Sequence, residues 1–393
     1  MLRKTIFWIH LSCGVIAGLV ILMMSVTGLL LTYERQLIEL ADKGAYYFSP
    51  TSQQSRLPLA ELIENADQQH SFNADAVTVW SDPRAPVRLQ AGRGQFLYVN
   101  PYVGSVYEPR SNSLDNFFRA VTGWHRWFNA SGDGRQIGRA ITGVCNLAFL
   151  FLVLSGIYLW LPRIYRWSAF KLRLWFSRSP TAAARDFNWH HVFGIWAAIP
   201  LIVIIASGSV FGYGWANNLV YQLVGEEAPQ RGRGPGGSGG QGQHAGTNDG
   251  AARIQQTSDH LAPENFIEVA AEQVDRDWNS ITLTLAESNA KTISLSIDQG
   301  NGGQPQKRHS ITLDTTSGEV MAWAPFNSQT TGRQARTWLR FLHTGEALGF
   351  IGQTIAGLAS FAAIIMVWTG LALALRRLQR YLKKKKAMKQ ALA

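Results

Sequence analysis

The sequence predicts a membrane protein with four transmembrane α-helices in two parallel repeats, each repeat with an α+β domain inserted between its helices. Three observations predict this fold class. The chain has four long apolar segments, a residue pattern that occurs in both of its halves, and strand-like alternation in its two long connections. The mean hydropathy of −0.04 conceals the apolar segments because it averages them with polar loops.

The four apolar segments comprise residues 6–32, 140–161, 192–215 and 350–375, and none of them contains Asp, Glu, Lys or Arg. Each reaches the length of about 20 residues that a helix needs to cross the hydrocarbon core. The first segment is too long for the apolar part of a typical signal peptide, and no A-x-A-like cleavage site follows it. We therefore expect an uncleaved membrane helix at the N-terminus.

The basic residues collect at one side of the predicted membrane. Six Lys and Arg residues lie in the connection 162–186 and eight lie in the tail 376–393, and Arg3 and Lys4 lie at the N-terminus. These three segments contain one acidic residue, Asp186. Positive residues gather on the cytoplasmic side of membrane proteins. We expect both termini in the cytoplasm and both long loops in the periplasm of a bacterial inner membrane. The tail then anchors the topology near anionic lipid, and no nucleic-acid partner is predicted.

The first and third apolar segments share one pattern, displaced by 180 residues. His10, Gly14, Thr27-Gly28 and Tyr33 match His190, Gly194, Ser207-Gly208 and Tyr213. The second and fourth segments share another, in which "IGRAITG" and "IGQTIAG" are each followed twelve residues later by a hydroxyl residue and glycine, Ser155-Gly156 and Thr369-Gly370. An aromatic stretch with one histidine, His125 or His343, precedes each. Such internal matching indicates two structural repeats related by an axis along the membrane normal.

The two long loops also resemble each other. Each begins with a helix-like stretch, "LAELIENADQQ" or "ENFIEVAAEQV", and continues with alternating strands, "AVTVW" and "VRLQA" or "ITLTLA" and "TISLSI". Each ends in a hairpin with an Asn- or Asp-led turn, "YVNPYVGSVY" or "TLDTTSGEVM". A glycine-rich linker is predicted at 228–252, because its composition cannot support a packed core.

These features divide the chain into eight parts. They are membrane helix 1 (1–33), periplasmic domain 1 (34–112), an interfacial segment with membrane helix 2 (113–161), a cytoplasmic loop (162–186), membrane helix 3 (187–215), periplasmic domain 2 (216–330), an interfacial segment with membrane helix 4 (331–375) and the basic tail (376–393).

Four histidines occupy repeat-matched positions at two depths of the predicted membrane. His10 and His190 lie near the cytoplasmic ends of helices 1 and 3, and His125 and His343 lie just before helices 2 and 4. A two-fold axis would bring each pair together around one centre. Two neutral imidazoles can ligate a haem iron from opposite sides, so the sequence predicts two haem b groups per chain. The chain has no C-x-x-C-H motif for covalent haem, and Cys13 and Cys145 both lie in predicted helices.

Other interpretations of these residues stay open. A histidine within a membrane helix can serve only as a helix–helix hydrogen-bond donor, and the glycines can serve only close packing. His191 is an alternative ligand to His190, although the repeat favours His190. Arg126 and Arg340, like Arg139, are candidates to bind haem propionates by charge-assisted hydrogen bonds, or simply lipid headgroups.

The chain resembles the PepSY-associated transmembrane proteins of Gram-negative bacteria. The resemblance rests on the two hairpins "YVNPYVGSVY" and "TLDTTSGEVM" and on "WIHLSCGVIAG", "NWHHVFGIW" and "FLHTGEALGFIG", and it covers nearly the full length. Some members are inner-membrane reductases that carry b-type haem and reduce a ferric siderophore of the ferrioxamine type. The resemblance implies His10, His190, His125 and His343 as haem-iron ligands.

We therefore expect an enzyme, a dihaem membrane protein that reduces a ferric siderophore in the periplasm and releases ferrous iron. The chemistry belongs to the cofactor, so no protein nucleophile or acid–base pair is predicted. No G-x-G-x-x-G motif follows a strand, so the electron donor is external, either a membrane quinol or a cytoplasmic reductase. Two alternatives remain: a siderophore or metal permease, and a non-catalytic sensor or peptide-binding protein of the membrane.

Overall fold

A computed structural model describes residues 1–42, 46–48, 54–92, 94–110, 112–178, 181–229, 261–285 and 290–391. The predicted glycine-rich linker lies outside these residues from position 230 onward. The chain divides into two compact units. Unit 1 comprises Met1–Glu34, Phe117–Ala228 and Ala335–Ala393, and unit 2 comprises Arg35–Asn116 and Pro229–Gln334.

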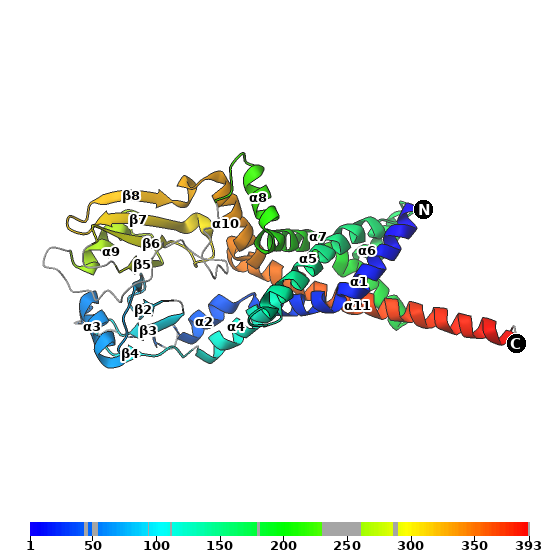
Figure 1. The fold of residues 1–393 in the computed structure, drawn as a ribbon, viewed down its shortest axis with the longest axis horizontal. Coiled ribbons are helices and arrows are strands. Elements are labelled where there is room, and N and C mark those ends of the chain that lie inside the picture. The colour runs from blue at the N-terminus through cyan, green and yellow to red at the C-terminus, as the bar shows by residue number, and fades with distance from the viewer. Residues whose placement is uncertain are drawn as a thin grey trace. The chain divides into compact units, whose positions relative to one another are not determined.

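Unit 1 is built on four long helices. They are α1 (Leu2–Leu31), α5 (Gly134–Trp160), α7 (Ala182–Gly212) and α11 (Gly349–Ala391). α1 and α7 each pack against both α5 and α11, so the four helices form a closed bundle (Figure 1). The four helices coincide with the four apolar segments, and each is long and apolar enough to cross a membrane, as predicted.

The outward faces of this bundle are apolar. Ile16 and Ile199 are 82% and 76% exposed. The most apolar window of each long helix is only 17% to 39% buried within the chain. In a water-soluble bundle such faces would be covered, whereas lipid accommodates them without cost.

The inward faces use small residues. The buried cluster between α5, α7 and α11 consists of Val153, Ala197, Ala198, Leu201, Ile205, Ala359, Ala362 and Ala363. Alanines let helix backbones approach closely, which is how helices associate where lipid removes the hydrophobic driving force. α7 continues through Pro200, the one proline within it.

Helices extend beyond the apolar segments at several ends. α7 begins at Ala182, where the Thr181 hydroxyl accepts from the Ala184 amide at 3.2 Å. The predicted cytoplasmic loop also contains α6 (Trp167–Leu174), and α11 continues through the predicted basic tail. Hydropathy marks only where a helix is apolar, while Ala, Lys, Arg and Gln sustain a helix well past that limit.

Shorter helices lie between the long ones along the chain. They are α2 (Glu34–Asp42), α4 (Asn112–Trp127), α8 (Gly214–Gln222), α10 (Thr331–Thr344) and the 3₁₀ turn η4 (Glu346–Leu348). α4 and α10 are the strongly amphipathic helices that carry His125 and His343. Both therefore lie along the bundle with one apolar side.

Unit 2 contains one antiparallel sheet of eight strands in the order β4-β3-β2-β1-β5-β6-β7-β8 (Figure 1). The strands are β1 (Ala76–Trp80), β2 (Val87–Ala91), β3 (Gln95–Val99), β4 (Val106–Tyr107), β5 (Ser280–Thr284), β6 (Thr292–Asp298), β7 (Arg308–Asp314) and β8 (Val320–Pro325). Strands β1 and β5 join the two loops of the chain, with Val77 opposite Leu283. The pattern within each loop does not reveal this pairing.

One face of this sheet forms the core of unit 2. Alternate strand residues such as Val77, Leu89 and Ile297 are fully buried, as a half-covered sheet requires. Helices α3 (Leu59–His70) and α9 (Pro263–Glu272) pack against it, with Leu62 and Phe266 in the same cluster. The 3₁₀ turns η2 (Pro305–Lys307) and η3 (Phe326–Ser328) flank β7 and β8.

Candidate functional site

His125 and His343 face each other within unit 1. Their ring centroids lie 6.4 Å apart with an interplanar angle of 63°. An imidazole nitrogen binds a metal ion at about 2.0–2.1 Å, so two rings that hold one ion from opposite sides have centroids roughly 6–6.5 Å apart. The separation of His125 and His343 therefore matches the spacing of two axial ligands of one metal ion.

Both residues of this pair are partly buried, and both rings are neutral. Burial, followed by the neighbouring His343, lowers the pKa of His125 to about 4. Burial also lowers the pKa of His343. Both imidazoles are thus unprotonated near pH 7 and have a nitrogen lone pair available, as a metal ligand needs.

Each ring of this pair is held through Nδ1 by a neighbouring long helix. His125 Nδ1 lies 2.9 Å from the Thr27 hydroxyl of α1. His343 Nδ1 lies 2.7 Å from the Ile204 carbonyl and 3.3 Å from the Ser207 hydroxyl, both on α7. The contacts explain how two short amphipathic helices place their histidines at fixed points of the bundle.

His10 and His190 lie toward the end of the bundle at which α1 begins and the basic part of α11 follows, where Arg377 stacks over Trp8 at 4.7 Å. His10 Nδ1 lies 2.8 Å from the Ser155 hydroxyl of α5. His190 Nδ1 lies 3.1 Å from both the Thr369 hydroxyl and the Met366 carbonyl of α11.

In all four histidines Nδ1 is engaged and Nε2 is free of hydrogen bonds to any described residue. A ring held through one nitrogen and open at the other is the arrangement of a metal-binding histidine. Among the described residues no group of three or more His, Cys, Asp or Glu side chains is placed to hold a metal ion. Two axial imidazoles suit a metal that arrives with its other ligands, as haem iron does in its porphyrin. The residues present therefore fit a haem.

His191 is placed differently from its neighbour. Its Nδ1 lies 2.8 Å from the Phe187 carbonyl, one turn back in the same helix. Its ring packs on the Phe187 ring with centroids 4.1 Å apart. Its hydrogen bond stays within α7, whereas His190 bonds to α11 and so faces into the bundle.

Arg126 lies beside His125 in a group of three guanidinium groups. Arg126 and Arg135 lie 4.8 Å and 4.1 Å from the Trp127 ring, and Arg139 donates to the Phe211 carbonyl. Burial, then Arg139 and Arg135, lowers the pKa of Arg126. Within the described ranges no Asp or Glu forms an ion pair with these three arginines. Three close cations of this kind favour an anionic ligand such as a carboxylate.

The other predicted arginine, Arg340, lies three residues before His343 on α10. Its guanidinium stacks over the Phe341 ring at 5.4 Å. Phe341 is buried, so the stacking fixes the base of the Arg340 side chain against the bundle.

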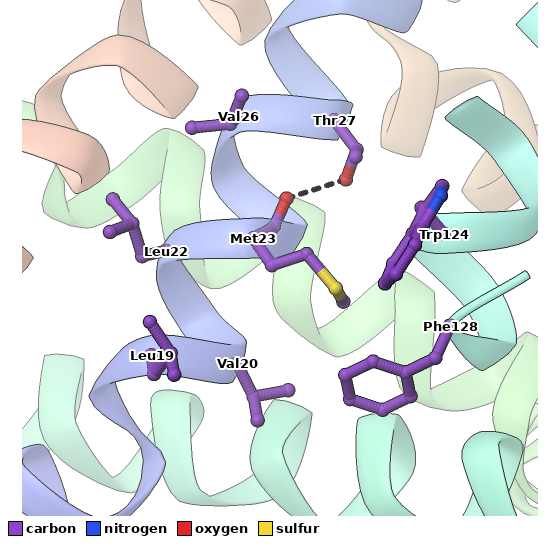
Figure 2. Close-up of a pocket in the computed structure, with 8 residues that line it drawn as sticks. All are labelled: Leu19, Val20, Leu22, Met23, Val26, Thr27, Trp124 and Phe128. Atoms are coloured by element: carbon purple, nitrogen blue, oxygen red, sulfur yellow. Dashed lines mark hydrogen bonds between the residues drawn. The ribbon is translucent and has the colours of Figure 1, made fainter.

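An apolar groove of about 500 Å³ lies on the surface of unit 1 between α1 and α4. Its lining residues are Leu19, Val20, Leu22, Met23, Val26, Thr27, Trp124 and Phe128 (Figure 2). None of the four histidines lines it, but Thr27, which lies 2.9 Å from His125 Nδ1, does. Figure 2 shows the Thr27 hydroxyl directed at the Met23 carbonyl.

The hydroxyl partners of the histidines are the functional residues that sequence reasoning did not identify. Thr27, Ser155, Ser207 and Thr369 were visible in the sequence as repeat-matched residues, each followed by glycine. Their matching signalled structural equivalence, but the contact with a histidine of another helix becomes evident only once the helices are packed.

The fold and its exposed apolar faces define an integral membrane protein. Residues 7–377 match the PepSY-associated TM region family, so the chain belongs to this family. No curated protein matches the sequence.

Proposed function

We propose that the protein is a dihaem electron carrier of the membrane that reduces a ferric siderophore. One observation carries the proposal above the others: the 6.4 Å separation of the His125 and His343 rings, with each Nδ1 already bonded to a neighbouring helix. Haem bound there would exchange single electrons, the chemistry that reduction of Fe³⁺ to Fe²⁺ requires.

The second centre in this proposal lies between His10 and His190. α1 carries His10 of one centre and Thr27, which contacts His125 of the other. Seventeen residues of helix separate them, or roughly 25 Å at 1.5 Å per residue. Two centres at opposite ends of one bundle provide a route for electrons across a bilayer with a core of about 30 Å.

We propose His190 rather than His191 as the ligand of that centre. The hydrogen bonds of His190 to α11 support this choice, because they turn the ring into the bundle. His191 bonds only to its own helix.

Arg126, Arg340 and Arg139 are proposed to bind the haem propionates. The group of Arg126, Arg135 and Arg139 near His125 supports this assignment, since these cations lack a carboxylate partner among the described residues.

The proposed topology has two parallel repeats in a bacterial inner membrane, with both termini cytoplasmic and the sheet unit periplasmic. The distribution of basic residues supports it, because the connection 162–186 and the tail carry most of the positive charge near the membrane. An external reductant would act at the His10 end, either a cytoplasmic reductase or a membrane quinol, which releases its two electrons in successive single transfers and so reduces two Fe³⁺ in all. One electron reduces each Fe³⁺ of a siderophore at the His125 end, and Fe²⁺ leaves because hard oxygen chelators hold it less tightly.

Visible spectroscopy tests the proposal against its alternatives. Purified protein with a sharp Soret band and split reduced α-bands indicates bis-histidine haem, and a ferric siderophore added to the reduced protein should then reoxidise it. A colourless protein would instead favour a metal permease or a non-catalytic membrane sensor. A coloured protein that no ferric chelate reoxidises would retain the electron carrier and exclude the siderophore substrate.

A further inference from the structure

Each of the four histidines contacts the same two-residue element on a neighbouring helix, a hydroxyl residue followed by glycine. We call these elements the hydroxyl–glycine pairs. They are Thr27-Gly28 for His125, Ser155-Gly156 for His10, Ser207-Gly208 for His343 and Thr369-Gly370 for His190. The contact therefore recurs in both repeats of the sequence and at both ends of the bundle, with one chemistry.

The hydroxyl of each pair has its own proton already engaged. Each donates to the carbonyl four residues earlier in its helix, at 2.7 Å for Thr27, 2.6 Å for Ser155, 2.6 Å for Ser207 and 2.7 Å for Thr369. A hydroxyl has one proton to donate. With that proton engaged, the hydroxyl accepts from the imidazole, and the proton of the neutral ring is then on Nδ1. At His343 and His190 the Ile204 and Met366 carbonyls, which can only accept, also contact Nδ1 and require the same tautomer. The lone pair is then on Nε2.

The glycine of each pair gives the ring the room to approach. A β-carbon would lie 3.4 Å from the ring carbon Cε1 at Gly28, 3.6 Å at Gly156, 3.1 Å at Gly208 and 3.2 Å at Gly370. The distances at Gly208 and Gly370 are too short for ordinary contact. At these two positions a β-carbon would require the imidazole to shift, whereas at Gly28 and Gly156 it would make ordinary van der Waals contact with the ring.

His191 shows what a histidine without such a pair looks like. It lies one residue from His190 on the same helix, but its Nδ1 bonds to a backbone carbonyl of its own turn. The pairs therefore distinguish four histidines from this neighbour by a specific contact rather than by burial alone.

We infer that the four hydroxyl–glycine pairs are positioning residues that fix the tautomer and orientation of His10, His125, His190 and His343, and so present Nε2 to the metal. This inference rests on the proposed function, because it assigns the pairs to the proposed haem centres. Partners of this kind orient a ligand and raise its basicity, and their loss typically lowers metal affinity about 10- to 100-fold.

The arrangement makes the inference testable at one helix. α1 carries His10 of one centre and Thr27, the partner of the other. Thr27→Val, which keeps the shape and removes the hydroxyl, should weaken haem binding about 10-fold at the His125–His343 centre only. It should also raise the reduction potential of that haem, because a less basic imidazole stabilises Fe³⁺ less. Ser155→Ala should do the same at the His10–His190 centre only.

The matched control is Ser25→Ala. Ser25 is buried in α1 half a turn from Thr27 and donates to the Ile21 carbonyl at 2.8 Å, but it contacts no histidine. The Ser25→Ala variant should leave both haems unchanged. The conservative variant Thr27→Ser keeps the hydroxyl, so the haem at the His125–His343 centre should have the wild-type reduction potential. Equal effects of Thr27→Val on both centres, or none on either, would overturn the inference while leaving the haem proposal intact.

A second readout does not depend on haem. In the full chain without cofactor, ¹⁵N spectra of labelled histidines should show His125 with its proton on Nδ1 in the wild type and a mixture of tautomers in Thr27→Val. A mixture in the wild type would contradict the inference. Absence of haem from wild-type protein would refute the proposed function. The tautomer measurement would still test whether the hydroxyl–glycine pairs fix the tautomer of the histidines.

Discussion

The rings of His125 and His343 lie with their centroids 6.4 Å apart, although they belong to α4 and α10 in separate segments of the chain. Each is held by a different long helix, α1 for His125 and α7 for His343. The separation of the rings is thus set by the packing of the whole bundle, and not by a local loop.

Replacement of either of these histidines should empty one centre. His125→Ala or His343→Ala is expected to remove about half of the haem per chain and to abolish reduction of a ferric siderophore, because one axial ligand is lost. Haem content and the reduced spectrum would be measured on purified protein. Retention of both haems in either variant would exclude this pair as the ligands.

The adjacent histidines of α7 should behave differently from each other. His190→Ala is expected to remove the haem at the other end of the bundle, whereas His191→Ala should leave it in place, because the hydrogen bond of His191 stays within α7. Haem content and the reduced visible spectrum of the two variants show which histidine is the ligand. The opposite outcome would move the ligand by one residue and break its match with His10.

A methyl group at Gly208 should disturb the His343 centre. The new β-carbon would lie 3.1 Å from His343 Cε1, and overpacking of this kind costs about 1–3 kcal/mol. We expect Gly208→Ala to lower haem occupancy at this centre. Gly212→Ala, in open space on the same helix, is the control and should not change occupancy. Equal losses in both variants would indicate a general effect on α7.

Asp186 should stabilise the contact between α7 and α11. Its carboxylate is buried and pairs with Arg376 at 2.6 Å and Arg185 at 2.9 Å. Both arginines are partly exposed, which limits the contribution of the pairs. Asp186→Asn should lower the free energy of unfolding by about 1–3 kcal/mol, measured as a fall in the thermal unfolding midpoint. An unchanged midpoint would show that solvent screens the charges.

The sequence predicts the elements of the fold better than their junctions. The strands "AVTVW" and "VRLQA" coincide with β1 and β2, because alternation of apolar and polar residue types is a local property of the sequence. The pairing of Val77 with Leu283 joins stretches far apart in the chain and leaves no local signal. The helical residues 182–186 are predicted as a loop for another reason, since Arg185 and Asp186 are charged and hydropathy does not detect a helix there.

The candidate site shows the same division. Repeat matching selected His10, His125, His190 and His343, since equivalent positions in two halves can be compared within one sequence. It also exposed the hydroxyl–glycine pairs, but as markers without a role. Their contacts run between helices that are distant in the sequence, so only packed helices show which hydroxyl accepts from which ring.

The central claim is that each pair of histidines holds one haem. The most direct measurement is the ratio of haem to protein in the purified full chain, with the low-spin state of the iron verified by electron paramagnetic resonance. Two haems per chain are expected, both low-spin with two imidazole ligands. A protein that contains no haem, and takes none up when haem is supplied, would rule out both haem centres.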